Sequence, residues 1–463
     1  MKSSKLTLFR IIIAGAICLL PIMNLCSAEP SPENETEEPV ENEEEVDEND
    51  ARVRENPVID GDDEIDIPVP DFIDQKDNRI TYNGADWSEL REAIADAERQ
   101  PVSLLNIGDS HVQADFGTGT IRDLLQYDYG DAGRGIITPL KMAGTNEPYD
   151  YVFTSTGSWN GEKLATQNWS QTMGFTGTSI RFRGTTGDLT VGTSEKDDYD
   201  PFISVAVFHK GQMAVTSVTN TEGEEVKFGT KPGRDFTIIR LGSEQNRITI
   251  HFETDGDLTV FGVSLSGGRP GVYYHAIGNN SGTYSLYNKI GNVGRGIKPL
   301  SPKLIIISLG TNEAFGSVDE TAFYNNIDRL VKNIQQENPE AEILLTTPME
   351  CQKSVYHTTS KKVAIRSRKG KKRYKTVSSR SRSYAVNDNC HLVRDIILRY
   401  GKDHKIATYD WYTVAGGNGA ASKWISNGLF SKDHVHHSVK GYRLQGRLLY
   451  EALSDAFKKQ LSN

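Results

Sequence analysis

The sequence predicts an α/β protein built on a parallel sheet, with an antiparallel β-sandwich inserted into it. The first observation is that continuous apolar runs alternate with amphipathic helical stretches over residues 67–148 and again over 269–463. Such runs are typical of strands buried on both faces and covered by helices. The second observation is that residues 149–268 instead contain short runs of alternating polar and apolar residues, separated by Gly, Asp and Asn. Regular alternation of this kind predicts a β-sandwich.

The individual elements follow from hydrophobic periodicity. In the α/β parts we expect a helix at 87–94, a strand at 102–107, a helix within 112–125, strands at 272–277 and 303–309, a helix at 321–338, a strand at 343–345, a helix at 391–400, a strand at 406–411 and a helix at 442–457. In the inserted region we expect strands at 179–182, 203–208, 236–241, 247–252 and 258–263.

The N-terminus predicts export. A lysine-bearing start precedes the apolar stretch 11–20, and the small residue Ala28 follows, so residues 1–28 resemble a secretory signal peptide. A lipoprotein anchored through Cys26 and an uncleaved membrane anchor are the alternatives. Residues 29–66 are rich in Glu, Asp, Asn and Pro and nearly devoid of apolar side chains, which predicts a disordered acidic tether. We expect a periplasmic or cell-surface protein.

Length and charge limit the remaining classes. A chain of 463 residues is long enough for two domains, and much of the acid behind its net charge of -10 lies in the tether. The rest is close to neutral, so we expect no nucleic-acid partner. Residues 358–386 form a basic segment, interpreted as a mobile loop; a patch for an anionic polymer, for membrane headgroups or for the acidic tether is the alternative. Cys351 and Cys390 are either a disulfide or two separate thiols. The sequence leaves the oligomeric state open.

The chemistry begins at Gly108-Asp109-Ser110-His111, between the strand predicted at 102–107 and the next helix. A serine at a strand-to-helix turn is exposed as a nucleophile, and the helix N-terminus offers free N–H groups. Three further stretches follow strand ends or precede the last helix: 278–282, 310–313 and 433–436. Since parallel sheets place ligands at the carboxyl ends of their strands, these stretches are expected to converge.

The side chains in these stretches suit acyl transfer. A serine hydroxyl needs a base, which His436 supplies, and the imidazole needs a carboxylate, which Asp433 supplies three residues earlier. The oxyanion needs donors, for which the Ser110 N–H, an N–H near Ser281 and Gly282, and the Asn312 amide are candidates. A metal cluster of histidines 434, 436 and 437 is the alternative, but no HExxH helix accompanies it, and we expect neither metal nor organic cofactor.

As an ordered set, these stretches resemble the blocks of the SGNH (GDSL-like) hydrolases. The resemblance implies that Ser110 is the nucleophile and that Asp433 and His436 complete the triad. It also implies a flavodoxin-like three-layer α/β/α catalytic domain and no cofactor. Asn312 matches the third block, although Glu313 stands where the family usually has Asp.

The second block departs from the family pattern. Its oxyanion residue falls at Ser281 when the alignment runs through Asn280, and at Gly282 when a glycine is retained. A backbone N–H donor exists in either alignment.

The layout, with a β-sandwich between the first and second blocks, is similar to bacterial peptidoglycan O-acetylesterases, whose insert resembles a carbohydrate-binding module. This implies an exported esterase acting on short acyl, O-acetyl esters of a saccharide such as peptidoglycan. Trp159 and Trp169 then stack on sugar rings, or else pack in the core. The alternatives are a lipase or lysophospholipase, a non-catalytic glycan-binding envelope protein, and acyl transfer to another sugar.

Overall fold

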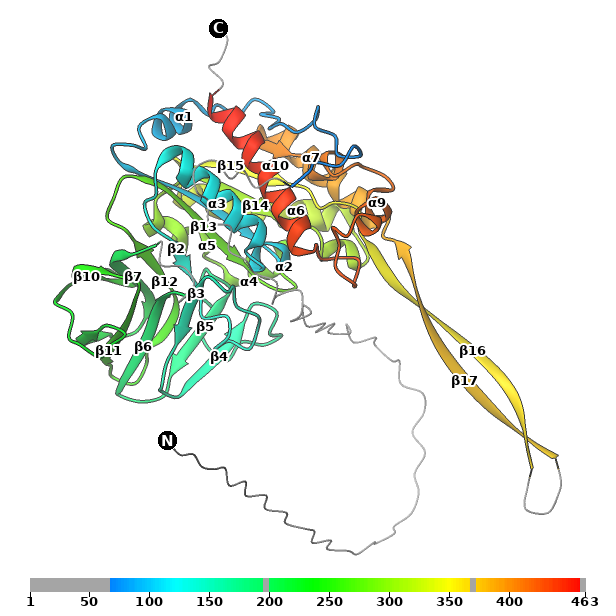
Figure 1. Cartoon of the computed structure of the whole chain (residues 1–463), viewed down its shortest axis with the longest axis horizontal. Helices are drawn as coiled ribbons and strands as arrows, with labels where there is room; N and C mark the ends of the chain where they lie inside the picture. The colour runs from blue at the N-terminus through cyan, green and yellow to red at the C-terminus, as the bar shows by residue number, and fades with distance from the viewer. Residues whose placement is uncertain (1–66, 195–199, 367–371, 459–463) are drawn as a thin grey trace, which may run out of the picture. The chain divides into compact units, whose positions relative to one another are not determined.

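The structure is a computed structural model that describes residues 67–194, 200–366 and 372–458 (Figure 1). The expected signal peptide and acidic tether, residues 1–66, lie outside the described residues. Within the described ranges, no helix has both the length and the apolar character needed to cross a bilayer.

A five-stranded parallel sheet forms the centre of the α/β part. Its strands, in spatial order, are β13 (Gly271–Gly278), β1 (Pro101–Gly108), β14 (Pro302–Ser308), β15 (Glu342–Thr346) and β18 (Ala407–Tyr409). Counted along the chain within this sheet, the order is 2-1-3-4-5, which is the flavodoxin-like arrangement. The expected fold class is confirmed, and the carboxyl ends of all five strands lie at one edge.

Helices cover both faces of the sheet and complete three layers (Figure 1). One face carries α1 (Ser88–Ala95), α3 (Phe116–Tyr129) and α10 (Val439–Lys458). The other carries α4 (Tyr284–Ile290), α5 (Val293–Ile297), α6 (Glu320–Glu337) and α7 (Asn389–His404). The connections contain α2 (Ser110–Gln113), α8 (Trp411–Val414), α9 (Ala420–Ser426) and the short 3-10 turns η1 (Lys298–Leu300) and η2 (Glu313–Phe315).

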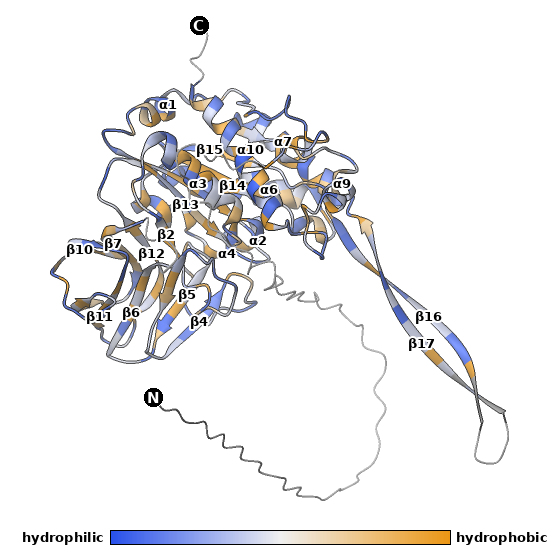
Figure 2. Cartoon of the chain, in the orientation of Figure 1, coloured by the Kyte–Doolittle hydropathy of each residue, from blue (hydrophilic) through white to orange (hydrophobic). Residues whose placement is uncertain are grey.

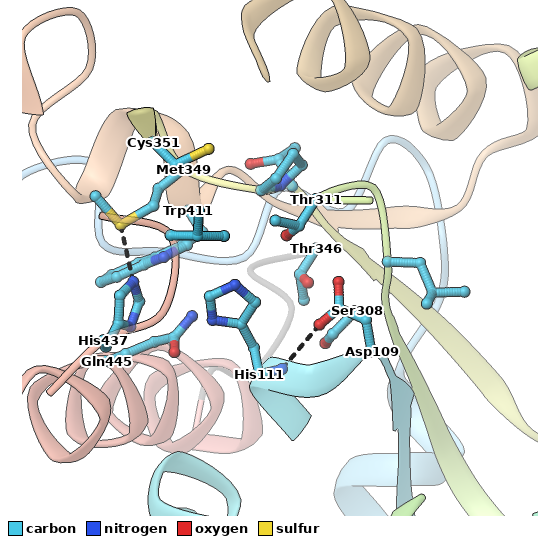
Figure 3. Close-up of a pocket in the computed structure, with 14 residues that line it drawn as sticks. Asp109, His111, Ser308, Thr311, Thr346, Met349, Cys351, Trp411, His437 and Gln445 are labelled. Carbon is cyan, nitrogen blue, oxygen red and sulfur yellow. Dashed lines mark hydrogen bonds between the residues drawn. The ribbon is translucent and has the colours of Figure 1, made fainter. Parts of the chain in front are cut away.

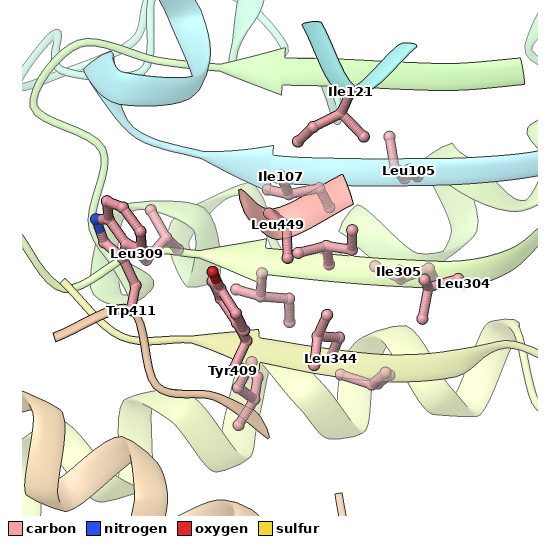
Figure 4. Packing of buried hydrophobic residues seen from close by; sticks show 14 of the residues in the cluster. Leu105, Ile107, Ile121, Leu304, Ile305, Leu309, Leu344, Tyr409, Trp411 and Leu449 are labelled. Carbon is pink, nitrogen blue, oxygen red and sulfur yellow. The ribbon is translucent and has the colours of Figure 1, made fainter. Parts of the chain in front are cut away.

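The apolar runs of the sequence become the core of these layers. In β1 every residue from Val102 to Gly108 is buried, as continuous apolar strands in parallel sheets require. Figure 4 shows Ile121 of α3 and Leu449 of α10 packed with the side chains of the central strands. On α6 the five apolar residues that share one side of the predicted helix are the ones that are buried: Phe323, Ile327, Leu330, Val331 and Ile334.

Between α3 and β13 the chain forms two antiparallel sheets. One has the order β4-β5-β12-β7-β10-β9, with β2 paired to β12, and the other has the order β3-β6-β11-β8. The bounds are β2 (Gly135–Ile137), β3 (Tyr151–Thr154), β4 (Trp159–Lys163), β5 (Thr178–Phe182), β6 (Thr186–Thr193), β7 (Phe202–Lys210), β8 (Ala214–Thr219), β9 (Phe228–Pro232), β10 (Phe236–Gln245), β11 (Arg247–Glu253) and β12 (Thr259–Ser266). Side chains of both sheets share one apolar cluster, as in a sandwich.

The basic segment is the clearest difference from the sequence prediction. A mobile loop over 358–386 is wrong for the described residues, because β16 (Gln352–Arg366) and β17 (Lys372–Val386) pair in register along their whole length. The two strands pair only with each other, as the twisted ribbon in Figure 1 shows. Figure 2 shows hydrophilic and hydrophobic positions interleaved along both strands. Neither face is uniformly apolar, so the period of two that marks a half-buried strand is missing from the sequence.

The helix expected within 112–125 is also divided in two. Asp115 lies between α2 and α3 in the left-handed region, with φ of 55°. The buried side chain of Asp115 accepts hydrogen bonds from Arg122 at 2.9 Å and from Arg134 at 2.7 Å. These charge-assisted bonds hold the break, so α2 keeps its own direction at the end of β1.

Gly278, at the end of β13, permits the close approach of α2 to the sheet. A Cβ at this position would lie 1.9 Å from the Gln113 nitrogen and 2.4 Å from its Cα, both in the backbone. Gly278→Ala is therefore expected to lower the free energy of unfolding by about 1–3 kcal/mol, measured by urea denaturation. Gly229→Ala, where a Cβ meets no atom within 4 Å, is the control and should change it far less. Equal effects would contradict this packing account.

Candidate active site

Ser110 is the first residue of α2, immediately after β1. The turn between the two is tight, because a Cβ on Gly108 would lie 2.3 Å from Val112 Cγ2 and 2.7 Å from the Ser308 carbonyl. Asp109 caps α2 by accepting a hydrogen bond from the His111 N–H at 3.0 Å. The Ser110 N–H lies in the first turn of the helix, where no intrahelical acceptor exists. The turn therefore presents both a hydroxyl and an N–H.

Ser110, His436 and Asp433 form one chain of hydrogen bonds. His436 Nε2 is 2.8 Å from Ser110 Oγ, and His436 Nδ1 is 2.5 Å from Asp433 Oδ2. Ser110 and His436 are 326 residues apart in the chain, and the structure brings the three predicted residues together. In the neutral ring with a proton on Nδ1, Nε2 is free to accept the serine proton.

Three hydrogen-bond donors hold the Asp433 carboxylate in place beside His436. Its Oδ1 accepts the N–H groups of Val435 and His436, both at 2.9 Å, and the hydroxyl of Ser431 at 2.7 Å. Burial opposes ionisation, but these bonds and the contact with His436 outweigh it and hold the pKa of the Asp433 carboxyl well below its usual range. The group is therefore ionised at neutral pH.

The loop at residues 278–282, the second-block loop, contributes one backbone N–H that has no hydrogen-bond acceptor among the described residues. Gly282 N–H donates to the Asn279 carbonyl at 2.9 Å and is thereby used within the loop. Ser281 has a φ of 59°, and among the described residues its N–H has no acceptor. Of the two residues that the sequence left open, the geometry therefore favours Ser281 as a donor.

Asn312 lies against the same loop. Its Nδ2 donates to the Gly282 carbonyl at 3.0 Å. An amide nitrogen carries two hydrogens, and within the described part of the chain the second has no acceptor. The structure thus places Asn312 beside the loop that contains Ser281, and the second Nδ2 hydrogen of Asn312 is available to an oxyanion.

Sequence reasoning missed the residues that clamp this loop. Gln113 Oε1 accepts the Asn280 N–H at 2.6 Å, and its Nε2 donates to the Asn146 carbonyl at 2.8 Å. Tyr287 donates its hydroxyl to the Gly108 carbonyl at 2.7 Å and accepts from Asn279 Nδ2 at 2.8 Å. Most of these bonds join segments far apart in the sequence, so no local sequence pattern predicts them.

Glu313 is a further clamp. Its Oε1 accepts the Tyr284 N–H at 2.8 Å, at the start of α4, while its buried Oε2 has no partner among the described residues. Burial raises the pKa of the Glu313 carboxyl to about 7, although the Tyr284 N–H partly offsets this. Glu313 stands where the family usually has Asp, and its carboxylate bonds to the Tyr284 N–H just after the second-block loop.

The raised pKa of Glu313 predicts a pH-dependent stability. Between pH 4.5 and about 7 the folded state binds more protons at this group than the unfolded state does, so the free energy of unfolding falls as pH rises. Glu313→Gln keeps a side-chain oxygen that can accept the Tyr284 N–H but no longer titrates. The free energy of unfolding should then fall by about 2–3 kcal/mol less between pH 4.5 and about 7, as measured by urea denaturation. Glu340→Gln, at an exposed carboxylate paired with Lys303, is the control and should leave the profile unchanged. A Gln variant with the wild-type pH profile would contradict the assignment.

A small cavity of about 40 Å³ lies behind the catalytic loop, with Asp109, His111, Thr311, Met349 and His437 in its lining (Figure 3). Burial raises the pKa of the Asp109 carboxyl to about 6 and lowers that of the His437 imidazole to about 3. His111 is likewise held neutral, because burial and the neighbouring histidines lower its pKa. The wall behind His436 therefore carries no cationic histidine at neutral pH.

The three clustered histidines face different partners. His434 Nδ1 contacts Gln352 Oε1 at 2.8 Å, whereas His437 Nε2 contacts Met349 Sδ at 3.1 Å and His436 contacts Ser110. The described residues contain no group of three or more His, Cys, Asp or Glu side chains placed to hold a metal. Their arrangement fits a triad rather than a ligand set.

The two cysteines of the described residues are neighbours. Cys351 and Cys390 are buried free thiols with their sulfur atoms 3.5 Å apart, so the structure has them unbridged. Both tryptophans of the inserted region are half-buried. Trp159 packs against Phe182 in the sandwich core, with ring centroids 4.8 Å apart, whereas Trp169 packs against the larger core and also lines a polar groove together with Arg181.

Part of the chain matches a known protein family. The sequence profile of the GDSL-like lipase/acylhydrolase family matches residues 260–444, which include Ser281, Asn312, Asp433 and His436. Residues 260–444 of the chain therefore match the GDSL-like lipase/acylhydrolase family, and the match supports a serine ester hydrolase. Ser110 lies outside the matched range and is joined to it by the hydrogen bond to His436.

Among solved structures, one shares the fold over most of the chain. A peptidoglycan O-acetylesterase is 22% identical, with a TM-score of 0.64, and the match covers 82% of this chain and 99% of that chain. A lipase/acylhydrolase from Enterococcus faecalis is 18% identical over 41% of this chain and 80% of that chain, with a TM-score of 0.27. A family two carbohydrate esterase from Clostridium thermocellum is 10% identical over 65% and 98%, with a TM-score of 0.28. No curated protein matches the sequence.

Proposed function

We propose that the protein is an exported serine esterase that removes short acyl groups, O-acetyl groups in particular, from a saccharide polymer. The observation that carries the proposal is the hydrogen-bonded chain from Ser110 through His436 to Asp433, beside the unoccupied N–H of Ser281. A triad of this geometry is the arrangement that activates a serine hydroxyl toward an ester carbonyl.

The steps follow from these contacts. Ser110 Oγ attacks the ester carbonyl while its proton passes to His436 Nε2, and Asp433 stabilises the imidazolium that forms. The N–H groups of Ser110 and Ser281 and the second Nδ2 hydrogen of Asn312 stabilise the oxyanion. His436 then returns the proton to the leaving saccharide oxygen. Water, activated by the same imidazole, releases the acyl group from Ser110.

The saccharide substrate and the short acyl group rest on one further observation. The fold match to a peptidoglycan O-acetylesterase extends over 82% of this chain, beyond the α/β part alone. Export is supported by the signal-like residues 1–28.

Asn312→Ala tests the oxyanion arrangement. Removing one preorganised donor is expected to lower kcat about 100-fold or more with little change in KM, since the donor acts on charge that develops in the transition state. The measurement is steady-state hydrolysis of p-nitrophenyl acetate. Asn389→Ala removes an amide that donates to the Ala314 and Gly316 carbonyls next to the same turn, and is the control for loosening. A comparable loss in both variants would argue against an oxyanion role.

Substrate class is tested with p-nitrophenyl esters of increasing chain length, followed by acetate release from O-acetylated peptidoglycan and acetylated xylan. The proposal predicts turnover confined to short acyl chains and acetate release from at least one of the two polymers. Turnover that favours long chains would instead indicate a lipase. Turnover of small esters with no acetate release from either polymer would contradict the saccharide substrate.

A further inference from the structure

The ribbon of β16 and β17 has an unusual composition. Between residues 352 and 386 the chain has twelve Lys and Arg residues and no Asp or Glu. A surface that balances its own charge mixes both signs, so this segment is built to face negative charge. The catalytic steps above use none of these residues.

Strand pairing places the aromatic residues and several cations of the ribbon on one face. The register pairs Tyr356 with Arg382 and Ala364 with Tyr374. Because directly paired residues point to the same side, as do residues two apart, all three tyrosines of the ribbon share this face with several cations. We call six of these residues, Tyr356, Lys362, Tyr374, Arg380, Arg382 and Tyr384, the tyrosine face. In the described strands, the opposite face has no Tyr, Phe or Trp.

Five of these six side chains are exposed, whereas Tyr384 at the root is half-buried, and two arginine–tyrosine pairs lie on the face. The Arg380 guanidinium lies 3.9 Å from the centre of the Tyr356 ring, and that of Arg382 lies 4.7 Å from the Tyr384 ring. Tyr356 and Tyr374 are 50% and 67% exposed. Exposed aromatic rings stack on flat apolar ligand faces, while guanidinium groups bind carboxylate or phosphate oxygens.

The root of the ribbon is bonded to the catalytic loop. Gln352 N–H donates to the His434 carbonyl at 3.0 Å, and Tyr384 donates its hydroxyl to the Lys432 carbonyl at 2.9 Å. The Tyr384 and His434 rings are 3.9 Å apart. Since His434 is two residues from His436, the tyrosine face begins beside the triad.

We propose that the tyrosine face binds an anionic saccharide polymer, one bearing carboxylate or phosphodiester groups, and leads it to the active site. This rests on the proposed function and specifies its substrate. Tyrosines distributed from Tyr384 at the root to Tyr374 suit successive sugar rings, and the interleaved cations suit the anionic groups. A ribbon that inserts into a membrane would carry its aromatic residues at one end, whereas these tyrosines are distributed along its length. A nucleic acid has similar chemistry, but the bonds to an ester-hydrolysing loop favour a glycan.

The test is binding of the full-length protein to polygalacturonate, followed by isothermal titration at several salt concentrations. The full-length protein is used so that the acidic residues 29–66 are present in the binding measurement. Lys362→Ser/Arg380→Ser should weaken binding about tenfold. Lys353→Ser/Lys361→Ser removes the same charge from the opposite face and should weaken it far less. Ser110→Ala should bind like the wild type.

Equal losses in the two double variants would overturn the proposal, since they would show diffuse attraction. So would equal binding of neutral xylan, or tighter binding to phosphatidylglycerol vesicles or to single-stranded DNA. Hydrolysis of p-nitrophenyl acetate reports the proposed function separately. Polymer binding without ester hydrolysis would refute the esterase alone, whereas hydrolysis without binding would refute the role of the tyrosine face alone.

Discussion

Ser110→Ala is expected to lower kcat for p-nitrophenyl acetate on the order of 10⁴-fold, because it removes the hydroxyl that lies 2.8 Å from His436 Nε2. The residual rate would come from substrate binding and the oxyanion donors. KM should change little, since the hydroxyl contributes mainly to the transition state.

The control for Ser110→Ala is Ser103→Ala, in the same strand. The Ser103 hydroxyl is buried and has no hydrogen-bond partner among the described residues, so its removal should leave turnover and stability nearly unchanged. Wild-type turnover in Ser110→Ala, with the fold intact by circular dichroism, would rule out Ser110 as the nucleophile.

Asp433→Asn is expected to lower kcat by roughly 10⁴-fold. The amide can donate to His436 Nδ1, which leaves the proton of the neutral ring on Nε2, facing Ser110, where it cannot act as a base. The substitution also costs stability at neutral pH. Because the folded state lowers the pKa of Asp433, its ionised form stabilises the fold above about pH 4, and this contribution is lost as pH falls.

Activity of Asp433→Asn must therefore be expressed per folded molecule, with the folded fraction measured by urea denaturation. Asp319→Asn is the matched control, since Asp319 caps α6 through the Ala322 N–H and asparagine caps equally well. If Asp433→Asn kept more than about a tenth of wild-type kcat, the carboxylate would not be orienting His436.

The sequence was sufficient for the parallel sheet because its strands are buried on both faces and are therefore apolar over most of their length. Strands such as β1 and β14 differ from every neighbouring segment in this respect. The ribbon was missed for the opposite reason, since β16 and β17 pair with no other strand and polar residues occur on both faces. Their pairing is set by backbone hydrogen bonds, which leave no hydrophobic period in the sequence.

The site divides in the same way. Ser110, Asp433 and His436 stand in recognisable local contexts, a strand-to-helix turn and a short Asp-x-x-His loop, and the structure brings all three together. Gln113 and Glu313 act through contacts across neighbouring loops, which no local pattern contains. The uncertainty between Ser281 and Gly282 likewise depended on which N–H is already bonded, and only the folded backbone specifies that.

The central claim is that Ser110 is the residue that becomes acylated. The most direct measurement is covalent labelling with a serine-directed fluorophosphonate, followed by peptide mass spectrometry and a parallel assay of p-nitrophenyl acetate hydrolysis. The account predicts one labelled residue, Ser110, with activity lost in proportion to labelling and no labelling in Ser110→Ala. Loss of activity with the label on another residue, or hydrolysis that persists in fully labelled protein, would contradict it.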